Sequence, residues 1–303
     1  KKMNKKILII GGTGFLGYHL AKKCLLKKWD VTSISTNIPK KIRFLPKVKY
    51  LILDITKKKL LLKKIKSNYD YVVNFGGYVN HSEKLKTYKS HYIGCKNLAD
   101  IFKNRKIKLF IQIGSSVEYG NIKSPQKENS KTEVNKLKST YGKAKLMATN
   151  YLLKLNKLHN FPCTILRLYL VYGPYQNTNR LIPYTLNECL NDNVFNCSAG
   201  KQYRDFLFVD DLMKAIFKCF YNKQSIGEIM NIGTGKPYNI KKVILFIKNN
   251  IKLGNPVFGK IPLRKDEILK LYPDISKVKK ILNWDPHTSL QKGIKTLTRY
   301  YKI

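Results

Sequence analysis

One glycine-rich segment restricts the fold of this 303-residue chain more than any other: residues 11–17 read Gly-Gly-Thr-Gly-Phe-Leu-Gly. The segment follows a short apolar run of strand type, residues 5–11, and opens a stretch with helical spacing. Gly11 and Gly14 let the backbone turn tightly and approach a phosphate, and Gly17 lets the helix pack on the strand. Because a helix N-terminus attracts anions, the segment predicts a site for the pyrophosphate of a dinucleotide.

The alternation of strand and helix continues along the chain. Short β-branched runs predict further strands, and helical spacing predicts the segments between them. This pattern is typical of an α/β doubly wound fold, in which helices cover both faces of a parallel (Rossmann) sheet. The predicted strands are 5–11, 31–35, 50–53, 71–75, 109–113, 164–168 and 228–232, and the predicted helices are 15–28, 57–67, 84–104, 139–158, 210–222, 239–250 and 288–302.

The regular alternation of strands and helices ends near Gly173, and beyond it prolines separate shorter elements. We expect residues 1–172 to form a dinucleotide-binding domain and residues 173–303 to form a smaller C-terminal substrate-binding lobe. The lobe is expected to be interleaved with the domain, because parts of 205–250 supply the last strand and helices of the sheet. A ligand should bind between the two, outside the carboxyl ends of the strands.

The formal net charge of +41 raises nucleic acid as a partner. However, the 59 basic residues include only seven arginines, which leaves 52 lysines spread along the whole chain. A nucleic-acid surface would use clustered arginine for bidentate contacts with bases and phosphates. We therefore expect solvated lysine surfaces and no nucleic-acid partner, with an anionic polymer as the alternative interpretation.

Compartment and membrane contacts are also restricted by the sequence. No apolar run approaches the ~18 residues of a membrane helix, and the basic start is followed by only four apolar residues, unlike an export signal. The six cysteines form no C-x-x-C pair, which favours buried thiols over a disulfide or metal site. We expect a cytoplasmic protein without a bound metal or a membrane partner.

The second predicted strand ends at Ser35, where NAD-binding sites of this type carry an acidic residue that bonds the adenine ribose. Without a carboxylate to repel a 2′-phosphate, and with a basic group at 40–43, the sequence favours NADP(H) over NAD(H). NAD(H) stays open, because Ser35 or Thr36 can also bond a ribose hydroxyl. Asp54 either binds the adenine amino group or caps the helix near 56–67. The expected cofactor contacts are Gly11, Thr13, Gly14, Phe15, Leu16, Gly17, Ser35, Thr36, Arg43, Asp54, Ile55, Phe75, Gly76 and Gly77, together with Tyr141 and Lys145 from a second motif.

That second motif is a Tyr-x-x-x-Lys pattern, Tyr141 to Lys145, at the start of a predicted helix. Ser139 precedes it as a good N-cap. Positions i and i+4 share one helical face, so the Lys145 ammonium can lie beneath the Tyr141 hydroxyl and stabilise a phenolate. Tyr141 is then a workable acid or base near neutral pH. Ser115, at the end of the fifth predicted strand, can bond the same substrate oxygen, so we expect Ser115, Tyr141 and Lys145 to be catalytic.

Together these motifs resemble the extended short-chain dehydrogenase/reductase superfamily, in particular its nucleotide-sugar epimerase, dehydratase and reductase group. The resemblance implies that Tyr141 is the acid/base, that Lys145 holds the nicotinamide ribose and that Ser115, next to Ser116, bonds the sugar. It also implies a homodimer formed through helices near 84–104 and 139–158. The matching segments are Gly-Gly-Thr-Gly-Phe-Leu-Gly (11–17), Ser-Ser-Val-Glu-Tyr-Gly (115–120), Tyr-Gly-Lys-Ala-Lys (141–145), Tyr-Gly-Pro-Tyr-Gln (172–176), Leu-Ile-Pro (181–183), Arg-Asp-Phe-Leu-Phe-Val-Asp-Asp (204–211), Asn-Ile-Gly-Thr-Gly-Lys-Pro (231–237) and Pro-Asp-Ile-Ser-Lys (273–277).

Arginine is rare in this chain, and the resemblance implies that several of the arginines contact an anion. Arg204 and Arg264 match positions that bind a nucleotide diphosphate, and Arg180 lies where the lobes should meet. A planar guanidinium binds phosphate in a bidentate way that lysine does not reproduce. A surface charge is the alternative interpretation for each of them, and for Arg43.

Two departures from the family pattern concern the substrate. Leu170-Val171 replaces an asparagine that touches the phosphates in many members, and His91 replaces a family asparagine. We interpret His81 and His91 as structural or cleft-lining residues rather than catalytic ones.

The leading hypothesis is hydride transfer between a nicotinamide and C4 of a nucleoside-diphosphate sugar, most simply reduction of a 4-keto sugar. A 4-epimerase with retained NAD is the alternative, and a non-catalytic dinucleotide-binding or RNA-associated protein is the alternative of another class. A 4,6-dehydratase is not expected, because Ser115 is followed by Ser116 and Val117, which do not titrate. Glu118 comes one residue too late and would point to the opposite face of an extended segment. The sequence leaves open the nucleotide base, the sugar and the direction of the reaction.

Overall fold

A parallel sheet of seven strands forms the centre of the computed structural model, which describes residues 4–263 and 267–301. The strand order is β11-β6-β5-β4-β1-β2-β3, and every neighbouring pair is parallel. The order reverses direction between β1 and β4, which creates a crevice at the carboxyl ends of these two strands. The strands are β1 (Lys6–Ile10), β2 (Asp30–Ser35), β3 (Lys49–Ile52), β4 (Tyr71–Asn74), β5 (Leu109–Ser115), β6 (Cys163–Leu168) and β11 (Ile229–Ile232).

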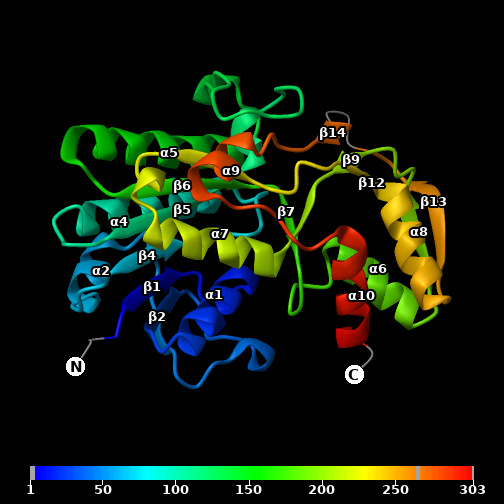
Figure 1. The fold of residues 1–303 in the computed structure, drawn as a ribbon, viewed down its shortest axis with the longest axis horizontal. Coiled ribbons are helices and arrows are strands. Elements are labelled where there is room, and N and C mark those ends of the chain that lie inside the picture. The colour runs from blue at the N-terminus through cyan, green and yellow to red at the C-terminus, as the bar shows by residue number, and fades with distance from the viewer. Residues whose placement is uncertain (1–3, 264–266, 302–303) are drawn as a thin grey trace.

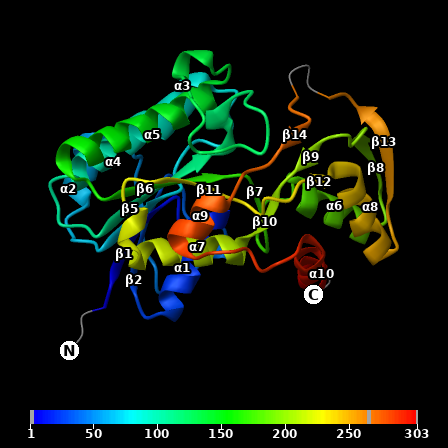
Figure 2. The ribbon, with the colours of Figure 1, turned by 45° about the horizontal axis from the view of Figure 1, so that its top comes forward.

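Helices cover both faces of this sheet, as Figure 2 shows for α4 and α5 on one side and α1 and α7 on the other. Alternate residues of β1 separate the two faces: Ile7 and Ile9 pack in one hydrophobic cluster, and Leu8 and Ile10 pack in the other. Because both faces are buried, the strands in the middle of the sheet are mostly apolar on both faces. One layer contains α1 (Phe15–Leu26), α7 (Val209–Tyr221) and α9 (Ser276–Leu282), and the other contains α2 (Lys58–Lys64), α4 (Gly94–Phe102) and α5 (Thr140–His159).

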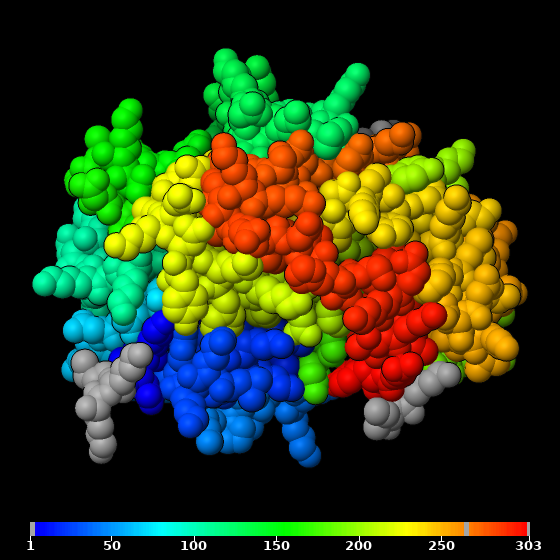
Figure 3. Space-filling model, in the orientation of Figure 1, coloured from blue at the N-terminus to red at the C-terminus, as the bar shows by residue number. Residues whose placement is uncertain are grey.

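A third hydrophobic cluster lies beyond the carboxyl end of β6, at the right of Figure 1. Two short strands that follow the sheet, β7 (Leu170–Tyr172) and β10 (Phe206–Phe208), contribute Tyr172, Phe206 and Phe208 to it. In Figure 3, α10 lies on the surface between the N-terminal segments (blue) and α8 (gold). The other elements of this part are α6 (Leu181–Leu190), β8 (Val194–Ser198), β9 (Tyr203–Arg204), β12 (Tyr238–Asn239), α8 (Ile240–Ile251), β13 (Asn255–Ile261), β14 (Lys270–Leu271) and α10 (Leu290–Tyr301).

The doubly wound α/β fold expected from the sequence is confirmed, and the strands begin and end within two residues of their expected positions. The helix expected over 84–104 differs, because it is divided into α3 (Lys84–Tyr88), a π-helical turn (Lys89–Ile93) and α4. Such turns often mark functional sites. This one contains His91, whose ring packs against the backbone of Gly77: a Cβ added there would lie 1.8 Å from the imidazole.

All six cysteines are buried, and they form no disulfide in the part of the chain that the structure describes. Within the same residues, no group of three or more His, Cys, Asp and Glu side chains could hold a metal ion. None of the described helices combines the length and the apolar character needed to cross a membrane.

Candidate active site

The glycine turn joins the end of β1 to the start of α1. Gly11 has a φ of +77°, which favours glycine, and Gly14 is the N-cap of α1. At Gly17 an added Cβ would lie only 2.3 Å from the carbonyl oxygen of Gly11. The first turn of α1 therefore packs directly on the glycine turn, and its N-terminus faces the crevice of the sheet.

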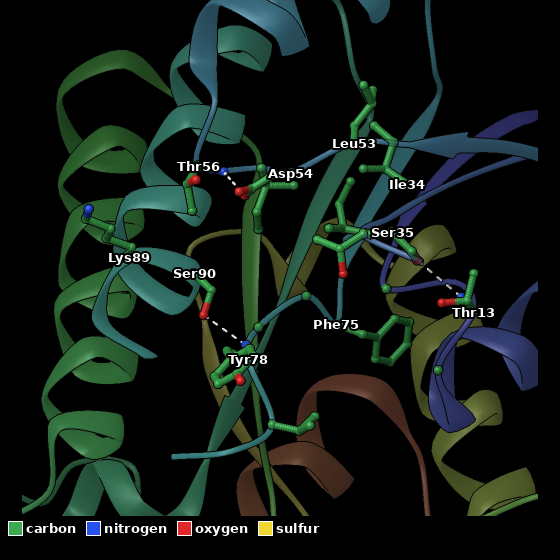
Figure 4. Close-up of a pocket in the computed structure, with 18 of the residues that line it drawn as sticks. Thr13, Ile34, Ser35, Leu53, Asp54, Thr56, Phe75, Tyr78, Lys89 and Ser90 are labelled. Carbon is green, nitrogen blue, oxygen red and sulfur yellow. Dashed lines mark hydrogen bonds between the residues drawn. The ribbon is translucent and has the colours of Figure 1, made fainter. Parts of the chain in front are cut away.

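A cavity of about 480 Å³ opens beside this turn, at the carboxyl ends of β1, β2 and β4 (Figure 4). Its shape comes from backbone segments that lack bulky side chains, and an added Cβ at Gly11 would lie 3.2 Å from the backbone of Phe75. This cradle fits a dinucleotide. Ten of the expected cofactor contacts line it: Gly11, Thr13, Gly14, Ser35, Thr36, Asp54, Ile55, Phe75, Gly76 and Gly77.

Charge in this cavity is distributed asymmetrically. Among its described lining residues, Asp54 is the single carboxylate, and its Oδ1 accepts a hydrogen bond from the N–H of Thr56 at 2.8 Å. Lys57, Lys86 and Lys89 supply positive charge. At the end of β2, the Ser35 hydroxyl accepts a hydrogen bond of 3.3 Å from the N–H of Thr13, so no acidic group occupies this position.

Six of the expected cofactor contacts lie outside the lining of this cavity: Phe15, Leu16, Gly17, Arg43, Tyr141 and Lys145. Phe15 and Leu16 pack against the hydrophobic cluster of α1 and α7, and Gly17 supports the turn. Arg43 is only 7% exposed, and its guanidinium donates to Oδ1 of Asn177 at 3.2 Å beside a separate cavity. Its contact with a 2′-phosphate therefore stays a prediction.

Sequence reasoning missed ten residues of the cavity wall, several of them in the loop after β4 and in the π-helical turn. Tyr78 and Ser90 are linked there, since the N–H of Tyr78 donates to Oγ of Ser90 at 2.8 Å (Figure 4). No motif marks these positions, because the turn brings them together only in the folded chain. The residues missed are Ile10, Ile34, Leu53, Thr56, Lys57, Tyr78, Val79, Lys86, Lys89 and Ser90.

Tyr141 and Lys145 lie on the first turns of α5. Oγ of Ser139 caps this helix by accepting the N–H of Gly142 at 3.0 Å. Lys145 is only 4% exposed, and its Nζ donates to the carbonyl oxygen of Ile113 at 2.6 Å. The same Nζ lies 5.8 Å from the centre of the Tyr141 ring. The ammonium is thus held against β5 and next to the phenol, as the i, i+4 spacing predicts.

Ser115 stands at the carboxyl end of β5 and caps the short turn that follows it. The start of α5 packs against this turn, since an added Cβ at Gly142 would lie 3.1 Å from the carbonyl oxygen of Val117. Ser116 is buried at 6% exposure. Packing of the turn on the helix places Ser115 and Tyr141 on neighbouring elements at one edge of the sheet.

Two histidines flank Tyr141. His81 stacks on the Tyr141 ring with centroids 3.8 Å apart and planes 12° apart, and His91 meets that ring edge-on at 4.8 Å. Burial, followed by the charge of Lys145, lowers the pKa of His91 to about 2. Burial also lowers the pKa of His81, with Lys145 and Arg180 contributing. Both imidazoles are therefore neutral near neutral pH. Nε2 of His91 donates to the carbonyl oxygen of Tyr78 at 3.1 Å, since a carbonyl accepts only.

Glu118 is fully buried and faces the protein interior. One of its carboxylate oxygens accepts the N–H of Ser115 at 2.9 Å. The other accepts the Thr149 hydroxyl at 2.8 Å and the Nε–H of Arg167 at 2.9 Å. The carboxylate is thus fully engaged and does not face a substrate.

The arginines predicted for the substrate occupy different surroundings. Arg180 is the exposed N-cap of α6, and its charge acts on His81. Arg204 pairs with Glu267 and lines a cavity of about 500 Å³ that also includes Tyr119 and Ser139. Arg264 lies outside the described residues.

Comparison with known proteins gives matches that span nearly the whole chain. The model of the NAD dependent epimerase/dehydratase family matches residues 7–233. A CDP-abequose synthase of Salmonella muenchen is 25% identical over 305 residues, and the alignment covers 97% of each chain. A putative UDP-glucose 4-epimerase of Methanocaldococcus jannaschii is 29% identical over 309 residues, with 98% of each chain covered. The crystal structure of UDP-glucuronic acid 4-epimerase from Bacillus cereus, in complex with UDP-glucuronic acid and NAD, has a TM-score of 0.85 at 25% identity and covers 98% of this chain and 99% of that chain.

Proposed function

This chain belongs to the NAD-dependent epimerase/dehydratase family, and we propose that it transfers a hydride between a nicotinamide and C4 of a nucleoside-diphosphate sugar. The family resemblance inferred from the sequence is thereby confirmed. One observation carries the proposed chemistry: the Lys145 ammonium is bonded to the Ile113 carbonyl oxygen of β5, 5.8 Å from the centre of the Tyr141 ring. The same sheet carries, at the ends of β1, β2 and β4, the cavity that fits a dinucleotide. A fold alone would not specify an activity.

Three side chains perform the steps that belong to the protein. Tyr141 moves a proton to or from the C4 oxygen, and the adjacent Lys145 ammonium favours the phenolate form of the tyrosine. The Ser115 hydroxyl bonds the same oxygen and orients it. The nicotinamide, when bound, supplies or accepts the hydride. His81 and His91, both neutral, line the cleft around Tyr141 and add no charge to it.

Net reduction of a 4-keto sugar with NADPH is the proposed direction. It rests on Ser35, which ends β2 without a carboxylate, and on the three lysines in the cavity wall. A 4-epimerase with retained NAD is the second candidate. The similarity to a putative UDP-glucose 4-epimerase and to an NAD-bound UDP-glucuronic acid 4-epimerase favours it.

Dehydration across C5 and C6 is not part of the proposal. That reaction needs a further acid and base beside the tyrosine. Glu118 is the nearest carboxylate after Ser115, and its three hydrogen bonds to Ser115, Thr149 and Arg167 hold it in the interior.

Membership of this family also supports a proposal for the site of the nucleotide diphosphate and a proposal for the oligomeric state. We assign contacts with the nucleotide diphosphate to Arg180 and Arg204, with Arg264 as a further candidate from the sequence. A homodimer through α3, α4 and α5 is also proposed. Leu85 and Leu158, which are 65% and 59% exposed on these helices, would then be covered by the second copy.

One experiment tests the proposed function with few assumptions. The purified protein is denatured, and released small molecules are identified by mass spectrometry. The protein is also incubated with NADPH or NAD and with nucleoside-diphosphate 4-keto sugars or hexoses. We expect a nicotinamide dinucleotide among the ligands, and reduction of the 4-keto group or inversion at C4. A protein that binds neither dinucleotide would contradict the proposal.

A further inference from the structure

Glu118 joins three elements of the active centre. It accepts hydrogen bonds from Ser115 at the end of β5, from Thr149 on α5 and from Arg167 on β6. Thr149 lies one helical turn after Lys145, on the same face of α5. The carboxylate therefore contacts the catalytic serine directly and contacts the helix that carries Tyr141 and Lys145.

The fold makes room for this carboxylate at one glycine. An added Cβ at Gly114 would lie 2.6 Å from Oε1 of Glu118 and 3.2 Å from Cγ of Arg167. In the parallel pairing of β5 with β6, Gly114 lies opposite Arg167. The side chains of Glu118 and Arg167 thus meet across the β5–β6 pair, where any larger residue at Gly114 would push them apart.

The two charges are isolated from solvent. The side chains of Glu118 and Arg167 are 0% and 1% exposed. Burial opposes the charge of Arg167, but Glu118 and Tyr119 together outweigh burial and raise the pKa of the guanidinium. The guanidinium also lies 4.4 Å from the centre of the Tyr119 ring. The guanidinium therefore keeps its charge and stays hydrogen-bonded to the Glu118 carboxylate.

Stability alone does not account for such a link. Well-packed apolar side chains often stabilise a core as well as a buried ion pair does. What an ion pair adds is geometric specificity, because charge-assisted hydrogen bonds are short and strong and prefer the lone-pair directions of the carboxylate. Here one of those bonds fixes the backbone of Ser115.

We propose that Glu118 is a positioning residue of the active centre. Its carboxylate, held by Arg167, fixes the end of β5 against α5, so that the Ser115 hydroxyl and the Tyr141 hydroxyl face the same substrate oxygen. This role rests on the proposed function of Ser115 and Tyr141. Glu118 itself touches no substrate, so its removal should affect turnover rather than binding.

The decisive variant replaces both charges at once, Glu118→Leu with Arg167→Met. Removal of the whole pair leaves no buried charge uncompensated, so the double variant should fold with a melting temperature close to that of the parent. We expect kcat to fall about 10- to 100-fold, the scale of a misplacement near 1 Å, while KM changes little. Its dissociation constant for the dinucleotide should match that of the parent.

A second variant and a matched control guard against loss of folding. Glu118→Gln keeps the shape of the side chain but cannot accept all three bonds, and it should lower kcat in the same direction. Asp211→Asn is the control, because Asp211 is another fully buried carboxylate, on α7, that accepts the N–H groups of His287 and Thr288. Asp211→Asn should lower the melting temperature without lowering kcat.

Hydrogen exchange separates this proposal from the proposed function. In the parent, the Ser115 amide is bonded to Glu118 and should exchange slowly. In the double variant that amide should exchange faster, while residues 109–113 of β5 stay protected. If the parent acts on no nucleotide sugar, the proposed function fails and the Ser115 amide alone decides the positioning role. A folded double variant, or a folded Glu118→Gln, with parental kcat and a protected Ser115 amide would overturn it.

Discussion

The ring of His81 stacks on the ring of Tyr141, with centroids 3.8 Å apart and 12° between their planes. The histidine comes from the loop after β4, and the tyrosine comes from the start of α5. This contact links the loop that lines the dinucleotide cavity to the acid/base of the proposed reaction. A change at His81 should therefore lower turnover, even though the imidazole itself exchanges no proton with the sugar.

His81→Ala should lower kcat about 2- to 10-fold, which corresponds to the ~0.5–1.5 kcal/mol of an aromatic pair. His81→Phe keeps a flat ring on Tyr141 and should retain most of the turnover. Steady-state kinetics of the two variants, with dinucleotide binding as the control, makes the comparison. Equal losses in both variants would show that the imidazole acts through its nitrogens and not by stacking.

Acid should destabilise the fold through His91. The pKa of His91 is about 2 in the folded chain, because of burial and Lys145, whereas a free histidine titrates near ~6.5. Below about pH 6.5 the unfolded chain binds a proton that the folded chain excludes, so the free energy of unfolding falls by up to about 1.4 kcal/mol per pH unit. His91→Asn removes this contribution. Urea unfolding at about pH 7.5 and pH 5 should show a smaller loss in the variant, and an identical loss in both proteins would refute the assignment.

Local patterns predicted the parts of the site that adjacent residues form. The Tyr141–Lys145 pair follows from helical spacing, and the glycine turn follows from its place between a strand and a helix. Contacts between distant segments could not be predicted in this way. Arg167 lies 49 residues from Glu118, and Asn177 lies 134 residues from Arg43.

Two further features escaped sequence reasoning for physical reasons. The π-helical turn at His91 lies directly between two α-helical stretches, α3 and α4, and no proline interrupts the segment, so the sequence predicts one continuous helix. Glu118 was expected to point to the opposite face of an extended segment, but it lies in a 3₁₀ turn, Ser116–Tyr119, that begins directly after Ser115.

NADP(H) should bind more tightly than NAD(H). The Ser35 hydroxyl at the end of β2 does not repel a 2′-phosphate, and Ser35→Asp should reverse the preference because a carboxylate would do so. Titration of both dinucleotides into the two proteins gives the answer. Tighter or equal binding of NAD(H) by the parent would favour the epimerase instead.

Arg43→Ala separates two interpretations of the same arginine. The sequence predicts that this change reduces the preference for NADP(H), whereas the structure bonds Arg43 to Asn177 beside another cavity. If the 2′-phosphate reaches Arg43, the variant should bind NADP(H) more weakly and NAD(H) unchanged. Unchanged binding of both would assign Arg43 to the packing of residues 175–179.

No product that has lost water should form from a nucleoside-diphosphate hexose. The only carboxylate directly after the Ser115–Val117 segment is that of Glu118, and it is bonded to Arg167 in the interior. Mass spectrometry of products after incubation with such hexoses and NAD tests this expectation. A 6-deoxy-4-keto product would contradict it and would direct attention to the other carboxylates near the cleft.

Turnover by Tyr141→Phe tests the central claim most directly. The substitution removes only the phenolic oxygen of a ring whose centre lies 5.8 Å from the Lys145 ammonium. It should therefore leave the dissociation constant of the dinucleotide nearly unchanged while it lowers kcat by at least ~10²-fold, the scale of a positioned acid or base. Both quantities are measured on the same preparation with the nucleotide sugar that the parent uses. A Phe variant that converts this sugar at the parental rate would contradict the assignment of Tyr141 as the acid/base.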